Sequence, residues 1–289
     1  MSKAKVKIIY QNNDIIVINK PAGVSVTKDR SGDDQLTDIL ADQLEPAVCS
    51  QLRLVHRLEK DTSGVMVLAK NIEAQTRFTT YFEKREIKKT YLAVVTGVVP
   101  GLQGTINAPL TRNRKNPALM CIAHKKGKAA VTNWQLLADF GSVALLAVHP
   151  LTGRTHQIRV HLPSIALPLA IDPLYGSSRP IFLSDFKLDY RLGKFQTEKP
   201  LIERLTLHAY QLVIPAEPVL SGVEGAAIQS VIPAQAGIQS YCFIASLDKK
   251  FAACLKMLTK YNPKGPNAFL NPDNFSKIIN TQLFTDYLI

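Results

Sequence analysis

Residues 54–70 constrain this chain more than any other stretch, because they set reactive polar side chains directly before a buried strand. The stretch reads LVHRLEKDTSGVMVLAK. A histidine, an arginine and two carboxylates lie within residues 56–61, and residues 62–64 then form a tight polar turn. The apolar run at residues 65–69 has the length and the β-branching of a buried strand. Charged side chains on a loop beside a core strand are typical of functional sites, although the same residues also suit a surface turn with an ion pair.

Residues 56–64, HRLEKDTSG, resemble the signature H-R-L-D-x-x-T-S-G of the RluA family of pseudouridine synthases. The single departure is Glu59, which stands at the position of the family's catalytic aspartate. Asp61 is a poor substitute, because the family often has an aspartate there in addition to its catalytic one. The resemblance implies an enzyme that isomerises uridine to pseudouridine in RNA, with Glu59 as its catalytic carboxylate.

The resemblance covers roughly residues 8–215 and 241–258. Four further segments carry it: NKPAG at 19–23, KTYLAVVTG at 89–97, TGRTHQIRVHL at 152–162 and DPLYG at 172–176. The third matches its family motif without a substitution, and before the fourth Ile171 replaces the usual glycine. The family likeness implies that Tyr91 stacks on the target base, that Arg159 pairs with the catalytic carboxylate, and that Arg57 enters the RNA where the base leaves.

The charge of the chain indicates the class of partner. A net charge of +12 and a pI near 9.5 favour a polyanion, and nucleic acid more than a membrane surface. Basic residues gather among turn residues at 110–128, where they would hold phosphates without reading base sequence. We expect ribosomal or transfer RNA as the partner. The residues expected to contact it are His56, Arg57, Lys88, Arg112, Arg114, Lys115 and Arg154.

Other classes of site and location find no support in the sequence. The four cysteines are scattered, with no C-x-x-C and no histidine at zinc spacing. The start of the chain lacks the apolar core of a signal peptide, and no run approaches the length of a membrane span. We therefore expect a cytoplasmic monomer without a metal and without a membrane partner, and the family likeness implies no cofactor.

Three other functions compete with the synthase. A serine hydrolase would present G-x-S-x-G, whereas Ser63 lies in T-S-G-V. A glycoside hydrolase could use Glu59 and Asp61, but two alternate residues of one loop seldom face each other across a sugar. A non-catalytic RNA-binding protein on the synthase fold stays open, because the altered residue of the signature is the one that performs chemistry. The mechanism also stays open between a carboxylate nucleophile and a base that removes the 2′ proton.

The family likeness implies an α+β pseudouridine synthase fold, with a central, mostly antiparallel β-sheet flanked by helices and an active cleft across its middle. Periodicity and turn signals predict strands at 5–19 (two, around an Asn-Asn-Asp turn), 65–69, 89–97, 131–140 and 143–148. They predict helices at 36–41, capped by Asp33 or Asp34, and at 72–85, capped by Asn71. The residues of the second that lie near helical spacing on its expected core face are Ile72, Phe78, Thr79 and Phe82. The likeness adds strands at 205–212 and 241–248 and a last helix at 247–258.

We expect residues 1–215 and 241–262 to form one catalytic domain. Residues 216–240 are mostly small, almost uncharged and unlike the family, which predicts an inserted surface segment that is exposed and dispensable. Residues 263–289 form a C-terminal tail without a predicted function. Family members with an extra small RNA-binding domain carry it ahead of the first hairpin, where this chain has only a few residues, so that domain is expected to be absent.

Overall fold

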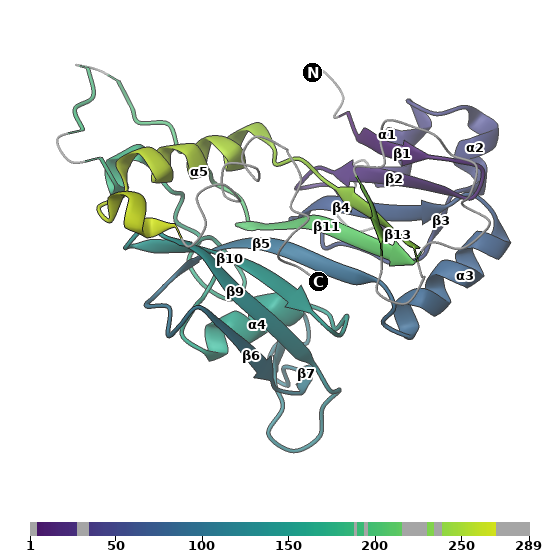
Figure 1. The fold of residues 1–289 in the computed structure, drawn as a ribbon, viewed down its shortest axis with the longest axis horizontal. Helices are drawn as coiled ribbons and strands as arrows, with labels where there is room; N and C mark the ends of the chain where they lie inside the picture. The colour runs from purple at the N-terminus through teal and green to yellow at the C-terminus, as the bar shows by residue number, and fades with distance from the viewer. Residues whose placement is uncertain are drawn as a thin grey trace. The chain divides into compact units, whose positions relative to one another are not determined.

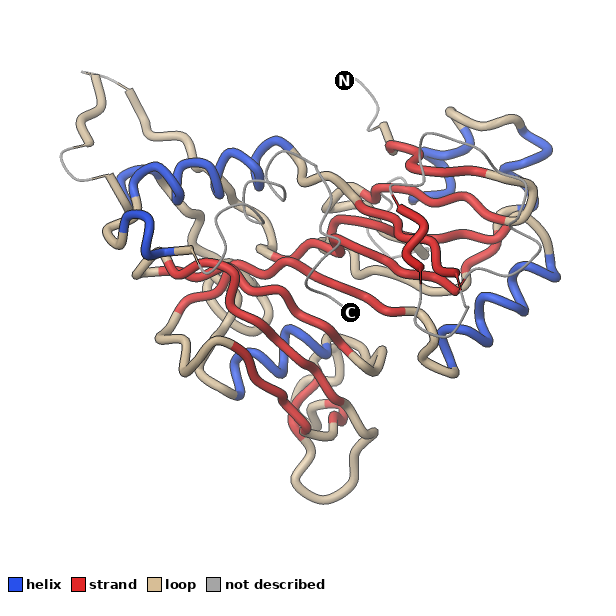
Figure 2. The backbone as a smooth tube through the Cα atoms, viewed as in Figure 1, coloured by secondary structure: helices blue, strands red, loops and turns tan. Residues whose placement is uncertain are grey.

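The computed structural model describes residues 5–27, 35–187, 190–193, 196–215, 230–233 and 239–269 (Figure 1). The chain forms two compact units and passes from one to the other four times. The first unit comprises Met1–Thr90, His208–Ser246 and Thr285–Ile289, and the second comprises Tyr91–Leu207 and Leu247–Phe284. Strands dominate both units and helices are few, which confirms the predicted α+β class (Figure 2). Within the described residues, no helix is both long and apolar enough to cross a membrane.

The strands of the first unit follow the order β1-β2-β4-β11-β13, with β3 beside β4 and β12 beside β13. Their bounds are β1 Lys7–Gln11, β2 Ile15–Lys20, β3 Arg53–Leu54, β4 Ser63–Ala69, β11 Leu207–Pro215, β12 Ser230–Pro233 and β13 Gln239–Ile244. The pairings are antiparallel except for the parallel pair β4 and β11. Every residue of β4 is buried, as expected for a strand covered on both faces. The candidate loop therefore leads into a strand that is buried along its whole length.

The first predicted hairpin is confirmed as β1 and β2. Its turn is held by Asn12, whose Oδ1 accepts the backbone N–H groups of Asp14 and Ile15 at 2.9 and 2.8 Å. The strand predicted at 65–69 begins two residues earlier, because Ser63 and Gly64 pair with β11. Gly64 has a φ of +121°, and a Cβ there would lie 2.0 Å from a backbone oxygen of β11, so only glycine fits this close approach.

The helices of the first unit are α1 Leu36–Ala41, α2 Pro46–Gln51 and α3 Ile72–Glu83. The predicted cap of α3 is confirmed, since Asn71 Oδ1 accepts the N–H of Ala74 at 2.7 Å. The predicted apolar face of α3 is partly wrong: Ile72 is 58% exposed, and the buried residues are Ala74, Phe78 and Tyr81. The first residue of a helix can lie beyond the core even when it is apolar. The cap of α1 is Gln35, and the predicted caps Asp33 and Asp34 lie outside the described residues.

The second unit holds the strand order β5-β10-β9-β6, all antiparallel. The bounds are β5 Lys88–Thr96, β6 Gln103–Asn107, β9 Val131–Asp139 and β10 Val143–Pro150, with a separate hairpin of β7 Leu110–Arg112 and β8 Met120–Ile122. The helices are α4 Gln157–Ser164, α5 Lys249–Tyr261 and the short 3-10 turns Leu183–Asp185 and Gly265–Ala268. Burial alternates along β9, so one face of this strand packs on the core. That core joins Trp134 of β9, Leu146 of β10 and Ile158 of α4.

The predicted strands at 131–140 and 143–148 and the basic hairpin at 110–128 are confirmed with small shifts in their ends. The closing strand is confirmed as β13, and the last helix is α5, which Asp248 caps by accepting the Phe251 N–H at 3.0 Å. Of the predicted insertion, residues 230–233 form β12 and pair with β13, while residues 216–229 and 234–238 lie outside the described residues. The start of the tail contacts the second unit through an ion pair between Lys264 and Asp139.

Candidate functional site

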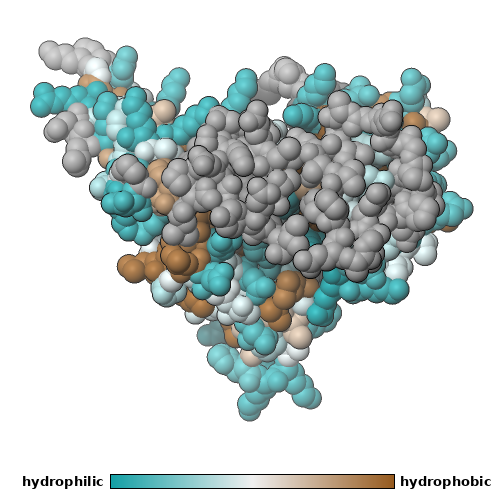
Figure 3. Space-filling model, viewed as in Figure 1, coloured by the Kyte–Doolittle hydropathy of each residue, from teal (hydrophilic) through white to brown (hydrophobic). Residues whose placement is uncertain are grey.

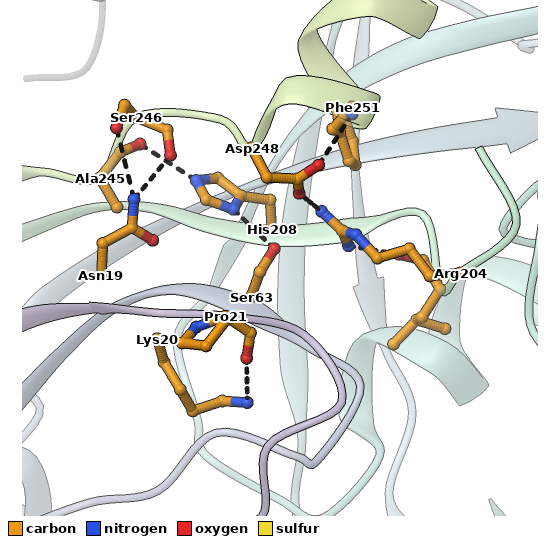
Figure 4. Close-up of polar contacts among 11 residues, drawn as sticks. Asn19, Lys20, Pro21, Ser63, Arg204, His208, Ala245, Ser246, Asp248 and Phe251 are labelled. Carbon is orange, nitrogen blue, oxygen red and sulfur yellow. Dashed lines mark hydrogen bonds and ion pairs between the residues drawn. The ribbon is translucent and has the colours of Figure 1, made fainter. Parts of the chain in front are cut away.

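The loop that carries Glu59 is tied to the end of β2 by a buried lysine. Lys20 has no exposed surface, and its Nζ is drawn in Figure 4. This ammonium donates to three carbonyl oxygens, those of Pro21, Val24 and Lys60, at 2.8, 2.8 and 2.9 Å. The N–H of Gly23 donates to the same Lys60 carbonyl at 2.9 Å. Because burying a cation without hydrogen bonds is costly, these contacts fix the backbone directly after Glu59. The NKPAG segment thus anchors the loop.

A buried serine–histidine pair anchors the other end of the loop. Ser63 Oγ lies 2.8 Å from His208 Nδ1, and His208 Nε2 lies 3.0 Å from the carbonyl oxygen of Ala245 (Figure 4). A carbonyl oxygen can only accept, so Nε2 carries a proton and donates it. In the neutral ring Nδ1 is then the acceptor for the Ser63 hydroxyl. The pair joins the polar turn to β11 and to the segment that follows β13.

Within the loop, burial separates the two carboxylates. Glu59 is half-buried, whereas Asp61 and Arg57 are exposed. Leu58, between Arg57 and Glu59, is 5% exposed. The carbonyl of Glu59 accepts the N–H of Thr62 at 3.1 Å, which closes the turn. Because Arg57 is exposed, it is accessible to a ligand. The role of Glu59 as the catalytic carboxylate stays a prediction.

His56 serves the interior of the first unit. Its Nε2 accepts the N–H of Val67 in β4 at 3.0 Å, and its ring stacks on Phe82 of α3 with centroids 4.3 Å apart. Burial, with a smaller contribution from the positive charge of Lys89, lowers the pKa of His56 to about 3. The imidazole is therefore neutral at physiological pH and holds the start of the loop against β4. Its predicted contact with RNA stays a prediction.

In the second unit, Arg159 of α4 forms a buried, bidentate ion pair with Asp172. Arg159 Nε lies 2.9 Å from Oδ2, and Nη2 lies 2.6 Å from Oδ1. The two side chains are only 4% and 2% exposed. Two parallel hydrogen bonds fix the plane of the guanidinium as well as its charge. Sequence reasoning identified Arg159 but missed Asp172 as a partner, although the DPLYG motif contained the signal.

Several residues of the motif TGRTHQIRVHL form hydrogen bonds that hold α4 against β9. Gln157 Oε1 accepts the hydroxyl of Thr152 at 2.6 Å, and its Nε2 donates to the Val131 carbonyl at 2.9 Å and to Thr132 Oγ1 at 2.8 Å. His161 lies on the same helix, with Nδ1 2.9 Å from Thr132 Oγ1. Burial lowers the pKa of His161, and a hydrogen bond to the carbonyl of Ala108 opposes this shift. These contacts hold α4, and with it Arg159, in place.

The residue before α4 has an unusual backbone. His156 has φ 54° and ψ 20°, the left-handed region that costs most residues about 1–2 kcal/mol. Its Nδ1 is hydrogen-bonded to the hydroxyl of Tyr175 at 2.6 Å. Arg154, two residues before His156, is half-buried and donates from Nε to the carbonyl of Ala129 at 3.0 Å. Strained backbone of this kind is found most often at functional sites.

Tyr91 lies on β5, opposite Val148 of β10, and its half-buried ring packs on the core of the second unit. The segment before Asp172 runs beside this strand: the N–H of Ala170 donates to the Val94 carbonyl at 2.8 Å. Ile171, which replaces the glycine of the family motif, is fully buried, and its N–H donates to Thr206 Oγ1 at 3.2 Å. The substitution is therefore accommodated in the core.

The basic hairpin, residues 110–128, presents its cations to solvent. The exposed cations are Arg112, Arg114, Lys115, Lys125, Lys126 and Lys128. Within the described part of the chain, none of them forms an ion pair. In Figure 3 the tip below β7 of Figure 1 is covered by hydrophilic side chains. Lys88, at the start of β5, is also exposed.

Comparisons with known proteins place these features in a family. The model of the RNA pseudouridylate synthase family matches residues 14–164. The chain belongs to this family. It is 33% identical over 215 residues to the ribosomal large subunit pseudouridine synthase D of Borreliella burgdorferi, covering 70% of this chain and 66% of that protein. It is 36% identical over 179 residues to an uncharacterized RNA pseudouridine synthase of Zymomonas mobilis, covering 60% of this chain and 80% of the relative.

Another relative and two solved structures agree with this family assignment. The ribosomal large subunit pseudouridine synthase D of Neisseria meningitidis is 36% identical over 208 residues, covering 71% of this chain and 53% of that protein. The chain thus spans between about half and two thirds of the length of these ribosomal relatives. The human RNA pseudouridylate synthase domain containing 4 has a TM-score of 0.60 at 25% identity, covering 87% of this chain and 92% of that one. The human domain containing 1 has a TM-score of 0.59 at 26% identity, covering 89% and 97%.

Proposed function

We propose that this chain is a cytoplasmic, monomeric RNA pseudouridine synthase that isomerises uridine to pseudouridine in structured RNA without a metal or a cofactor. The observation that carries the proposal is the anchoring of both segments that bear the chemistry. Lys20 and the pair Ser63–His208 hold the loop of Glu59, and Asp172 holds Arg159. The names of the relatives make large-subunit ribosomal RNA the first substrate to test, with transfer RNA second.

The proposed reaction breaks the bond between C1′ of the sugar and N1 of the base, rotates the base, and joins C1′ to C5. The C5 proton is lost and N1 gains one, so substrate and product are isomers. Glu59 supplies the carboxylate, either as a nucleophile at the sugar or as the base that removes the 2′ proton. Arg159 supplies the cation that keeps a carboxylate ionised, and Tyr91 supplies an aromatic face for the extruded base.

The remaining candidate residues serve to bind RNA. Arg57 is exposed next to Glu59 and fills the space that the base leaves. The cations of the basic hairpin, together with Lys88 and Arg154, hold the phosphate backbone and contribute affinity without sequence information. The exposure of the hairpin cations and of Lys88, and the lack of ion pairs at the hairpin cations within the described residues, support this assignment.

A second function is favoured by one observation, the glutamate at the catalytic position. A non-catalytic RNA-binding protein would keep the basic hairpin and the fold and would tolerate Glu59. The two functions differ in whether any uridine is converted, since both predict RNA binding.

Direct mapping of pseudouridines in cellular RNA, with and without this gene, tests the proposal. We expect at least one pseudouridine to disappear on deletion and to return when the parent chain is supplied. The variant Glu59→Ala should not restore it. An unchanged pseudouridine map, with RNA binding intact in vitro, would favour the non-catalytic function.

A further inference from the structure

The turn Asp172–Gly176 is tied to the arginine of the proposed site. The carboxylate of Asp172 is bonded to Arg159, and its Oδ1 also accepts the N–H groups of Leu174 and Tyr175 at 3.0 and 3.2 Å. The N–H of Gly176 donates to the Asp172 carbonyl at 2.9 Å, which closes the turn. The turn therefore cannot shift without disturbing the ion pair that orients Arg159.

Tyr175 joins this turn to two further parts of the second unit. Its hydroxyl accepts the N–H of Met120, the first residue of β8, at 2.7 Å and is hydrogen-bonded to His156 Nδ1 at 2.6 Å. Its ring lies under the guanidinium of Arg159, with Cζ 5.3 Å from the ring centroid, within cation–π range. One side chain thus contacts the hairpin, the strained residue before α4 and Arg159.

The basic hairpin has few other attachments to the unit at this end. Its strands are three residues each, and its apolar base is a small cluster around Leu110, Ala130 and Val160, against which Met120, Ile122 and Tyr175 pack. Packing of this size leaves orientation poorly defined, whereas a hydrogen bond to the backbone of β8 is directional. The hydroxyl of Tyr175 is therefore well placed to fix the angle of the hairpin relative to α4.

We propose that Tyr175 is a positioning residue, which sets the position of Arg159 relative to RNA bound on the basic hairpin. The inference rests on the proposed function, because it takes the hairpin as an RNA-binding surface and Arg159 as part of the reacting site. RNA bound to the hairpin cations fixes the position of β8. The hydrogen bonds of the Tyr175 hydroxyl then fix the position of the turn and of α4 relative to β8. Without the hydroxyl, the hairpin still binds phosphates but no longer sets the position of Arg159.

The variant Tyr175→Phe removes the hydroxyl and keeps the ring under Arg159. With transcribed large-subunit ribosomal RNA as the probe, we expect its dissociation constant to stay within about twofold of the parent. We expect the single-turnover rate of pseudouridine formation to fall about tenfold or more, because small displacements of reacting groups cost rate rather than binding. A matched control is Tyr261→Phe at the end of α5, whose hydroxyl forms no hydrogen bond within the described residues.

Hydrogen exchange with and without RNA gives a second measurement that does not need turnover. In the parent, RNA should slow exchange both in the basic hairpin and in residues 157–176. In Tyr175→Phe, RNA should slow exchange in the hairpin alone. Equal protection of residues 157–176 in both proteins, or a loss of affinity that matches the loss of rate, would overturn the inference.

The failure of the proposed function is distinguishable from the failure of this inference. A parent that binds the RNA but converts no uridine contradicts the proposed catalysis, while the exchange measurement still decides the role of Tyr175. A parent that binds neither large-subunit ribosomal RNA nor transfer RNA overturns both. A Tyr175→Phe protein that unfolds at lower denaturant but keeps the parent's rate shows a purely structural tyrosine and also overturns the inference.

Discussion

At the scale of single residues, the backbone on both sides of the Glu59 side chain is held by other groups. Leu58 is buried before it, and the carbonyl of Lys60 after it receives hydrogen bonds from Lys20 and Gly23. A loop held this way cannot retreat to compensate for a longer side chain. Glutamate therefore carries its carboxylate outward by one methylene, on the order of 1 Å, and displacement of that size can cost about 100-fold in rate.

We predict that Glu59→Asp raises the rate of pseudouridine formation about tenfold or more, while RNA affinity changes little. Glu59→Ala should abolish the activity that remains. Tritium release or mass-shift detection on bulk RNA compares both variants with the parent. If the aspartate variant is as inert as the alanine variant, the defect lies elsewhere, with Ile171 the first residue to replace. If the parent is already fast, the site has adapted to glutamate.

Arg159 illustrates a residue whose loss has two consequences. Its ion pair with Asp172 is buried, so Arg159→Ala leaves a buried carboxylate without its bidentate partner. We predict that the free energy of unfolding falls by about 3–5 kcal/mol and that activity is lost. Urea unfolding measures the first effect. Arg179→Ala, which breaks an exposed ion pair with Asp185, is the control and should leave the midpoint unchanged. Equal loss in both variants would contradict the role assigned to burial.

His56 makes the stability of the first unit depend on pH. Its pKa is about 3 in the folded chain and near 6.5 when unfolded, so the unfolded state binds the extra proton first as pH falls. The contribution of neutral His56 to the free energy of unfolding is therefore complete above pH 6.5 and is lost progressively between pH 6.5 and 3. From pH 6.5 to 5 the loss is roughly 2 kcal/mol. His56→Gln should remove this part of the pH dependence in urea unfolding. The slope that remains reports other groups, among them His161.

At the scale of elements, local sequence signals predicted the type and order of helices and strands better than their boundaries and their buried faces. The first hairpin, the Asn71 cap and the pair β9 and β10 follow directly from turn residues, caps and periodicity, whereas the last helix was predicted from the family likeness. The start of β4 could not be read from sequence, because Ser63 and Gly64 pair with β11, far along the chain, and Gly64 also pairs with Lys20 of β2. The same limit hid Asp172 and His208, whose partners are set by tertiary contact. Short α2 has no periodic signal to find.

The basic hairpin is the element whose charge can be tested alone. We predict that RNA affinity falls steeply with salt, with a slope of about −0.7 per phosphate contact on single strands. Charge reversal at Arg112, Arg114 and Lys115 should flatten that slope by the contacts they make. Reversal of Lys249, Lys256 and Lys260 on α5 changes the net charge equally and should flatten it less. A slope that responds to both sets alike would show that net charge, and not the hairpin, governs binding.

At the scale of the whole molecule, the sequence identified the family and its chemistry, while the division into two units came only from the structure. The predicted site residues fall in both units: His56, Arg57, Glu59 and Lys88 in the first, and Tyr91, Arg112, Arg114, Lys115, Arg154 and Arg159 in the second. Motif matching assigns roles residue by residue and contains no information on compactness. The anchoring groups that the motifs also contain, such as Lys20 and Gln157, become recognisable only once their partners are known.

The predicted insertion tests whether the fold needs all of its chain. Pro215 of β11 lies opposite Ser240 of β13, so a two-residue Asn-Gly turn can close this hairpin after residues 216–239 are removed. The deletion takes away β12, which pairs with β13, but leaves the pairing of β13 with β11. We predict that the free energy of unfolding stays within about 1 kcal/mol of the parent, because the segment has few large apolar side chains and a shorter loop costs less entropy to close.

Urea unfolding of the deletion, beside a variant in which the segment is replaced by a Gly-Ser linker of equal length, separates the effect of loop length from that of side chains. If the deletion fails to fold while the linker variant is stable, the turn is too tight for β11 and β13. If both lose stability, β12 and its neighbours belong to the core of the first unit.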